Sequence, residues 1–432
     1  MKKNTIALAL IFCLFFLWAI SSNLLPTMIR QLMKTCELNT FEASFTESAY
    51  WLAYFICPIP IAMFMKKYSY RSGIIVGLLL AAAGGLLFLP AAMIKSYGVY
   101  LCIFFIIATG MCFLETAANP YVTALGDPAT ATRRLNLAQS FNGLGAFIAA
   151  MFLSKLVLSG NNYTRDTIPT DYPGGWEGFI NQETDSMKMP YLILAGVLII
   201  VAIVLALQRL PKVEDQEAAA DEAEANGKST KLIDFSTLRH PHLLWGVVAQ
   251  FFYNGGQTAI NSLFLVYCCT YVGIDEATAT TFFGLYMLAF LAGRWIGTML
   301  MTRFAPEKML LAYAIANVLL CIVVTCVGGM AGMYAMLAIS FFMSIMYPTQ
   351  FSLAITGLGS QTKSGSAFLV MAIVGNACVP QLTAFIMHTH EEAYQVAYLI
   401  PMVCFAVCAV YAWRYKALLP KLKAGAHKPA YK

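Results

Sequence analysis

Charged residues are scarce in this chain: Asp, Glu, Lys and Arg make up 12% of its 432 residues, whereas 59% are hydrophobic. A soluble domain carries about 25% charged residues, so an ordinary globular domain is excluded. The sequence contains no phosphate-binding loop, and no ATP-driven mechanism is visible. Its twelve cysteines are scattered, and only Cys36 falls in a predicted outward loop, which excludes a disulfide framework.

Apolar runs long enough to cross a bilayer recur along nearly the whole chain. Each span needs roughly 20 apolar residues, and the runs are continuous rather than alternating, which indicates helices. The first run continues to Leu32 without a small-residue cleavage site, so we expect an uncleaved first helix. We predict an all-α integral membrane protein with about twelve transmembrane helices, near 6–32, 45–65, 73–94, 98–125, 136–158, 189–209, 243–270, 278–300, 308–329, 331–357, 364–388 and 393–415.

The longest predicted cytoplasmic loop divides the chain into two halves. Its centre, VEDQEAAADEAEANGKS, is acidic and alanine-rich, as is typical of a linker. We predict an N-terminal six-helix bundle over 1–210, a linker over 211–241, and a C-terminal six-helix bundle over 242–432 with a short basic tail. Asn119-Pro120 and Tyr347-Pro348 are each followed by a short turn and a glycine-rich helix with an adjacent Asn and Gly. This echo favours an internal repeat of the transporter type, although Pro and Gly also recur in unrelated membrane helices.

Basic residues set the orientation of the helices. About 21 of the 28 Lys and Arg residues fall on the side that both termini share, and membrane proteins keep that side in the cytoplasm. The net charge of +6 is therefore a topology signal and gives no support to nucleic-acid binding. We expect a multi-pass protein with both termini cytoplasmic.

Polar side chains in an apolar setting mark the stretch 114–145. Glu115 follows seventeen residues without formal charge, 98–114, and Asn119, Gln139 and Asn142 have equally apolar surroundings. An ionisable group at membrane depth is a functional-site candidate by default. Glu115 can take up a proton on one side of the membrane and release it on the other. The alternative is a structural carboxylate bonded to an Asn or an interfacial Arg.

Four amides form a stripe on the predicted seventh helix: Gln250, Asn254, Gln257 and Asn261. At 100° per residue they fall within about 60° of arc. Amides suit the hydroxyls of a neutral polyhydroxylated ligand, whereas helix–helix packing is the alternative. A charged ligand would call for Arg or Lys in the bundle. Arg294 is the one deep basic residue, and we expect it to act in gating or to reach the inner surface.

The first predicted helix combines an aromatic with small polar residues. Trp18 precedes Asn23, and Pro26 frees backbone carbonyls nearby. Trp18 offers a platform for the apolar face of a sugar ring, or is simply a packed aromatic. We expect no catalytic residues, because the deep polar groups are amides and one Glu. His388 and His390 fall in a predicted outward turn, and we expect no metal site and no cofactor.

Several stretches in both halves carry a family resemblance. They are FLWAISSN, ICPIPIAMFMKKYSYRSGIIVGL, LETAANPYVTALG, RLNLAQSFNGLGA, GRWIGTMLMTRFAPEKML and SIMYPTQFSLAI with TKSGSAFLVMAIVG. Together they resemble the fucose permease branch of the major facilitator superfamily. The resemblance implies a two-bundle alternating-access fold in a bacterial inner membrane and proton-coupled import of a hexose such as fucose or galactose. It implies that Glu115, Gln139 and Asn142 line the sugar cavity and that Trp18 joins them.

The chain departs from that family pattern on its first helix. The family carries an Asp where this chain has Pro26, and Glu47 stands where a neutral Gln is expected. We therefore predict that Glu115 carries the coupled proton and that Glu47 is the fallback, with an ion pair to Arg30 as its alternative. A facilitator, a sodium-coupled carrier and a membrane sugar sensor are the competing functions. The expected partners are a neutral sugar and lipid, with the protein a monomer.

Overall fold

The computed structural model describes residues 2–38, 40–153, 163, 167–208, 234–389 and 391–419. Within these ranges every regular element is a helix, which confirms the all-α prediction. The centre of the predicted linker, the end of the predicted fifth span and the basic tail lie outside the described residues. The domain boundaries therefore stay a prediction.

The first half of the chain forms six spans, four of which are broken into two pieces. A proline stands at the start of α2 and of α4, where its missing N–H and its ring interrupt the helical hydrogen bonds. The spans are α1 (Lys2–Asn23) with α2 (Leu25–Thr35), α3 (Thr40–Ile56) with α4 (Pro58–Lys67), α5 (Tyr70–Leu86) with α6 (Phe88–Ile94), α7 (Tyr97–Ala124), α8 (Ala131–Ile148) with the π-helix η2 (Ala149–Leu153), and α10 (Gly175–Leu207).

The second half repeats this plan. Its spans are α12 (Pro241–Val266) with η4 (Tyr267–Val272), α13 (Glu276–Leu300), α14 (Pro306–Cys326), α15 (Gly329–Met343) with α16 (Met346–Ala354), α17 (Thr362–Met371) with η6 (Ala372–Val374) and α18 (Gly375–Thr389), and α19 (Leu399–Leu418). Short 3-10 turns lie at η1 (Pro128–Thr130), η3 (Phe235–Arg239), η5 (Gly359–Gln361) and η7 (Glu391–Tyr398).

Hydropathy alone detects most of these spans. Among the described residues, nine helices are long and apolar enough to cross a membrane, or ten if the bent pair α3 and α4 counts as one span. Neither α8 nor α12 is among them. These two helices carry Gln139, Asn142 and the amide stripe. The polar residues that mark the candidate site thus lower the hydropathy of the helices that carry them.

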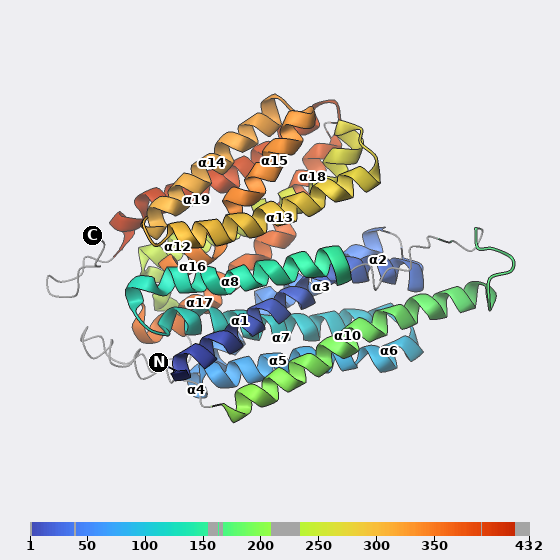
Figure 1. Ribbon diagram of the computed structural model, residues 1–432, viewed down its shortest axis with the longest axis horizontal. Coiled ribbons are helices and arrows are strands. Elements are labelled where there is room, and N and C mark those ends of the chain that lie inside the picture. The colour runs from blue at the N-terminus through green and yellow to red at the C-terminus, as the bar shows by residue number, and fades with distance from the viewer. Residues whose placement is uncertain are drawn as a thin grey trace.

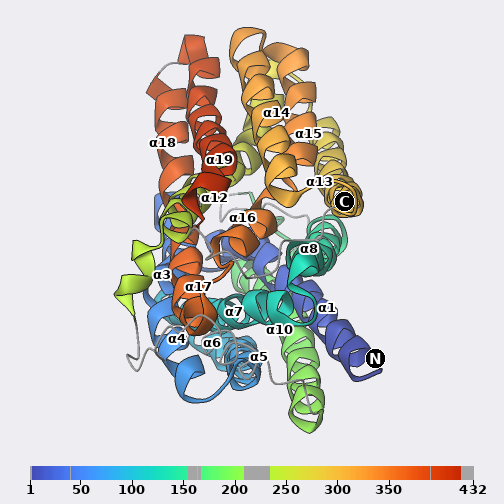
Figure 2. The same cartoon turned by 90° about the vertical axis from the view of Figure 1, so that its left-hand side faces the viewer.

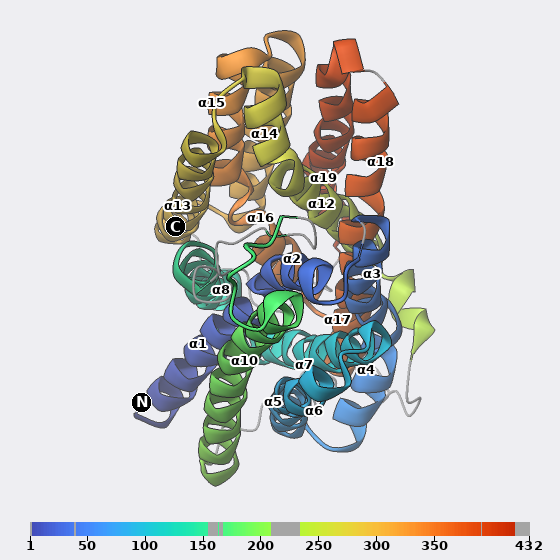
Figure 3. The ribbon, with the colours of Figure 1, turned by 90° about the vertical axis from the view of Figure 1, so that its right-hand side faces the viewer.

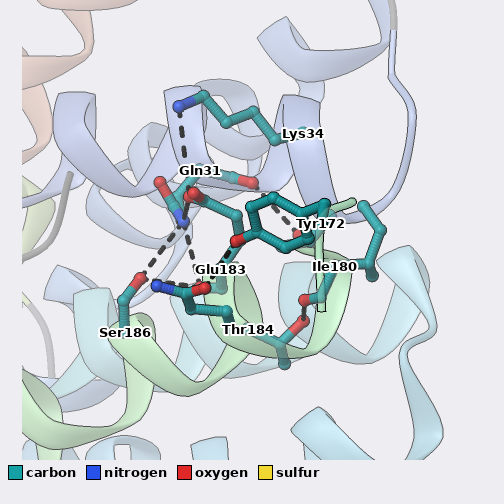
Figure 4. Close-up of polar contacts among 9 residues, drawn as sticks. Gln31, Lys34, Tyr172, Ile180, Glu183, Thr184 and Ser186 are labelled. Carbon is teal, nitrogen blue, oxygen red and sulfur yellow. Dashed lines mark hydrogen bonds and ion pairs between the residues drawn. The ribbon is translucent and has the colours of Figure 1, made fainter. Parts of the chain in front are cut away.

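The sixth span begins earlier than predicted. The sequence predicts a polar outward loop up to residue 188, but α10 already starts at Gly175. Buried Gln31 of α2 donates from Nε2 to the Glu183 carboxylate, to the Glu183 carbonyl (3.0 Å) and to Ser186 Oγ (3.2 Å) (Figure 4). Lys34 Nζ lies 3.9 Å from the same carboxylate. These contacts tie the outer extension of α10 to the first span.

The helices gather into two groups that correspond to the two halves of the chain. Figure 1 shows α1 beginning and α19 ending on the same side of the molecule, which we call the terminal side. Seen from that side, α1 to α10 lie in one group and α12 to α15, α18 and α19 in the other, whereas α17 lies against α4 and α7 of the first group (Figure 2). Figure 3 views the opposite side, where α2 and the start of α10 face the viewer.

Each half contains a close contact between a glycine and a helix backbone at the corresponding position. A Cβ atom on Gly145 of α8 would lie 2.4 Å from the Phe16 carbonyl of α1. A Cβ atom on Gly375 of α18 would lie 2.1 Å from the Phe251 carbonyl of α12. Both distances are too short for any side chain, so the fifth span meets the first as the eleventh meets the seventh. This correspondence supports the internal repeat predicted from the sequence.

The halves touch each other along α8 and α13, and also through several contacts on the terminal side. There α4 packs against α17 and α8 against α16. Thr132 Oγ1 lies 2.9 Å from Ser352 Oγ, and Asn136 Nδ2 donates to Thr349 Oγ1 over 3.1 Å. The Lys363 ammonium of α17 sits 4.7 Å from the centre of the Tyr70 ring of α5. The structure is therefore closed on the terminal side.

Candidate functional site

Glu115 and Tyr347 meet at the centre of the boundary between the halves. Glu115 lies on α7 with 3% of its surface exposed, and the Tyr347 hydroxyl of α16 donates to its Oε1. The Asn119 and Gln250 side chains lie near the same hydroxyl without a hydrogen bond to it. A carboxylate, a phenol and two amides from both halves therefore converge on one point.

Two predicted residues of the N-terminal half join this cluster. Asn119 stands one turn after Glu115 on α7, and Gln139 Nε2 of α8 donates to its Oδ1 over 3.2 Å. Both side chains are buried. Asn119 Nδ2 has no partner, so one donor remains for a further group.

Arg294 connects the cluster to the broken tenth span. From α13 its Nη1 donates to the Gln139 carbonyl over 2.6 Å, and its Nε donates to the Ser344 carbonyl over 2.8 Å. The guanidinium also lies 4.5 Å from the centre of the Phe290 ring. Only 3% of Arg294 is exposed, so the expectation that it reaches the inner surface is wrong. Its two carbonyl partners account for its deep position, because a planar guanidinium can donate in several directions at once.

The break in the tenth span places Tyr347. The helical hydrogen bonds stop between α15 and α16, which leaves backbone carbonyls in need of other donors. Tyr253 of α12 donates its hydroxyl to the Met343 carbonyl over 2.8 Å, and Arg294 takes the Ser344 carbonyl. Both carbonyls are thus paired, and the new helix begins one residue before Tyr347.

The predicted residues of the first span lie at the edge of the cluster. Trp18 is 8% exposed and packs on Phe15 with ring centres 5.7 Å apart. Asn142 of α8, which is half-buried, donates from Nδ2 to the Phe15 carbonyl over 3.3 Å. Asn23 donates from Nδ2 back to the Ala19 carbonyl of its own helix over 2.8 Å. The Asn23 amide thus bonds to its own helix in this structure.

The amide stripe of α12 is divided along its length. Gln250 and Asn254 are buried, and Asn254 Nδ2 donates to the Gln250 carbonyl over 2.7 Å. Gln257 is half-buried. Asn261 accepts a hydrogen bond from the Tyr286 hydroxyl of α13. Only Gln250 reaches the cluster, whereas Asn261 packs against the next span.

Glu47 lies apart from the cluster, towards the side opposite the termini. It is half-buried on α3, and the Trp51 indole donates to its Oε1 over 3.3 Å. The ion pairs found among the described residues do not include one between Glu47 and Arg30. In the same part of the chain, no three His, Cys, Asp or Glu side chains gather as metal ligands; His390 lies outside the described residues.

Sequence reasoning missed Tyr347 and Tyr253 as site residues. The available signal was the internal repeat, since Tyr347-Pro348 occupies the place in the second half that Asn119-Pro120 occupies in the first. The sequence does not indicate the contact of Gln31 with Glu183, because Glu183 falls in a predicted loop.

Comparison with known proteins agrees with this architecture. The family model of the Major Facilitator Superfamily matches residues 7–379. The L-fucose-proton symporter of Escherichia coli (strain K12) is 39% identical over 413 residues, which cover 95% of this chain and 93% of that protein. A glucose/galactose transporter of Brucella abortus (strain 2308) is 34% identical and covers 95% and 94%. A crystal structure of the transporter FucP in the outward conformation superposes with a TM-score of 0.83 at 38% identity and covers 96% of this chain and 99% of that one.

Proposed function

Because this chain belongs to the Major Facilitator Superfamily, we propose that it is a secondary transporter that imports a neutral monosaccharide together with protons. Fucose, galactose and related hexoses are the candidate substrates. The relatives named L-fucose-proton symporter and glucose/galactose transporter support this class. The protein is a multi-pass membrane protein of twelve helices in two bundles and not an enzyme.

The hydrogen bond from Tyr347 to Glu115 carries the proposal. It joins the two halves at a titratable group, so a change of charge on Glu115 acts on a contact that the halves must break to move apart. An ionised carboxylate only accepts hydrogen bonds, whereas a protonated one also donates, and bonds to the ionised form are the stronger. Protonation of Glu115 thus weakens the link and frees both groups for a ligand.

The surrounding amides give the site its preference for a neutral ligand. Gln139 bonds to Asn119 in this structure, whereas Asn119 Nδ2 and the Gln250 amide have no partner. Sugar hydroxyls supply donors and acceptors of the kind that these amides need. We propose that the sugar is bound by the set predicted from sequence, namely Trp18, Asn23, Glu115, Asn119, Gln139, Asn142, Gln250, Asn254, Gln257 and Asn261.

Arg294 is the proposed gate. Its bond to the Gln139 carbonyl crosses between the halves, whereas its bond to the Ser344 carbonyl stays within one. Opening of the terminal side must break the first bond and can keep the second. Glu47, on the opposite side, is the second candidate for the coupled proton.

The orientation of the termini tells to which side of the membrane the closed terminal side belongs. The distribution of Lys and Arg supports cytoplasmic termini, and the structure is then closed to the cytoplasm, in keeping with its likeness to an outward conformation. We place the protein in a bacterial inner membrane, as a monomer in contact with lipid and without a nucleic-acid partner or a cofactor.

Two alternative functions are a facilitator and a carrier driven by sodium. Pro26 favours them, because it stands where the family resemblance leads us to expect an acidic residue on the first helix. Uptake of radiolabelled L-fucose, D-galactose and D-glucose into proteoliposomes, with and without an imposed pH gradient, separates these functions. The proposal predicts accumulation of at least one sugar that depends on the pH gradient. Uptake that only equilibrates, or that follows a sodium gradient, contradicts proton coupling.

A further inference from the structure

Two glutamines beside Tyr347 are buried without hydrogen bonds. Gln250 on α12 and Gln350 on α16 have no exposed surface. Neither the nitrogen nor the oxygen of either side-chain amide has a hydrogen-bond partner. Among the buried amide side chains of the described residues, these are the two in which both polar atoms lack a partner.

The two glutamines share the interface between α12 and α16. Gln350 follows Tyr347 by three residues, so both project from a similar face of α16. The Cys408 thiol donates to the carbonyl of Ala249, next to Gln250, over 3.5 Å, and the same thiol lies within reach of Gln350. A thiol is only a weak hydrogen-bond partner, so it does not satisfy an amide.

Burial of an unpaired amide destabilises a fold. A methionine at position 350 would fill a similar volume without that cost, so packing gives no reason for an amide there. Buried polar groups without partners are rare enough in native proteins that each calls for an explanation. The neighbouring cluster offers an explanation, because Gln250 lies near Tyr347 without bonding to it.

We propose that Gln350 is a positioning residue for sugar recognition that acts through Gln250. When sugar enters beside Tyr347, the two unpaired amides pair with each other, and Gln350 fixes the orientation of the Gln250 amide. A glutamine carries an acceptor oxygen and two N–H donors, so the paired Gln250 keeps one donor and one lone pair for a sugar hydroxyl. This inference rests on the proposed function, that a neutral sugar binds beside Tyr347.

A double-mutant cycle on the full-length protein tests the proposal. We expect Gln350→Met to fold with unchanged or higher thermal stability, yet to bind sugar about three- to tenfold more weakly, the range set by one neutral hydrogen bond. We expect the same substitution to have no further effect in a Gln250→Met background, because residues that act as a unit are not additive. The probes are L-fucose, D-galactose and D-glucose, and the measurement is equilibrium binding to purified protein.

Ser366→Ala is the matched control. Its hydroxyl on α17 is also buried and without a partner, but it lies outside the proposed site, so its loss leaves sugar affinity unchanged. Wild-type affinity in Gln350→Met, or losses that add up in the double variant, would overturn the proposal. If the wild type binds none of the three sugars, the proposed function itself fails and this inference falls with it.

Discussion

Arg294 and Gln139 are joined by a 2.6 Å hydrogen bond from the guanidinium of one half to a backbone carbonyl of the other. The side chain of Gln139 bonds to Asn119, one turn from Glu115 on α7. This bond between the halves thus shares a residue with the proposed sugar site. This connection explains how a ligand between the halves can affect their separation.

Substitution of Arg294 therefore shifts the balance between closed and open states. Arg294→Lys keeps the charge but loses the planar guanidinium that serves two carbonyls, and a hydrogen bond to a charged group contributes about 1.5–3 kcal/mol. We expect a cysteine at the buried position Thr349 to react at least roughly tenfold faster with a membrane-permeant thiol reagent in the Arg294→Lys variant than in the protein that keeps Arg294. Arg303→Lys, at an exposed position, is the control. Equal reaction rates in both backgrounds would show that Arg294 is not a gate.

A disulfide across the terminal side tests alternating access. The hydroxyl oxygens of Thr132 and Ser352 are 2.9 Å apart in opposite halves, which suits the short Cβ separation of a disulfide. We expect the Thr132→Cys/Ser352→Cys variant to lose transport on oxidation and to regain it on reduction. The pair Ser69→Cys/Ser72→Cys, whose hydroxyl oxygens are 2.9 Å apart within one half, is the control. Transport that persists in the oxidised cross-half variant contradicts the proposed motion.

The amides of α12 are expected to contribute to sugar binding. Loss of a partner for a buried hydroxyl costs about 1–3 kcal/mol, so Asn254→Ala and Gln257→Ala should weaken binding roughly tenfold or more. Equilibrium binding to purified protein measures this, with Gln250→Ala and Asn261→Ala alongside. Asn317→Ala, a buried amide on α14, should keep its affinity. Wild-type affinity in all four α12 variants would leave helix packing as their role.

Thiol labelling maps the cavity. With the native cysteines removed, Trp18→Cys, Gln139→Cys and Asn142→Cys should react with small hydrophilic reagents, and bound sugar should protect them. Asn142 is more exposed than Gln139 in this structure, so its cysteine should react faster. Labelling that no tested sugar slows would assign these residues a structural role.

The sequence predicted the helices well because each span needs a long apolar run, and such runs are visible without an alignment. It also singled out Glu115, Asn119, Gln139 and Gln250 as candidates, since a polar residue among apolar neighbours at membrane depth is conspicuous. It placed the start of the sixth span fourteen residues too late, because the outer extension of α10 is polar and is held by contacts with Gln31 that no local pattern encodes.

Partners of side chains were the other part that sequence could not give. Helical spacing placed Asn261 on the same face as Gln250, yet one bonds to Tyr286 and the other reaches Tyr347. Which neighbour each meets depends on how α12 packs against α13 and α16 along its length. Tyr347 itself is one of 22 tyrosines, and its place in the repeat does not reveal that it meets Glu115.

The central claim is that Glu115 carries the coupled proton, and it is tested most directly by comparing counterflow with pH-driven uptake for Glu115→Gln. The glutamine imitates the protonated carboxyl, so this variant should bind sugar and exchange it across the membrane but fail to accumulate it against a gradient. Glu47→Gln, measured in parallel, should accumulate sugar as the wild type does. Undiminished pH-driven accumulation by Glu115→Gln would contradict the account, and loss in Glu47→Gln alone would move the proton site to α3.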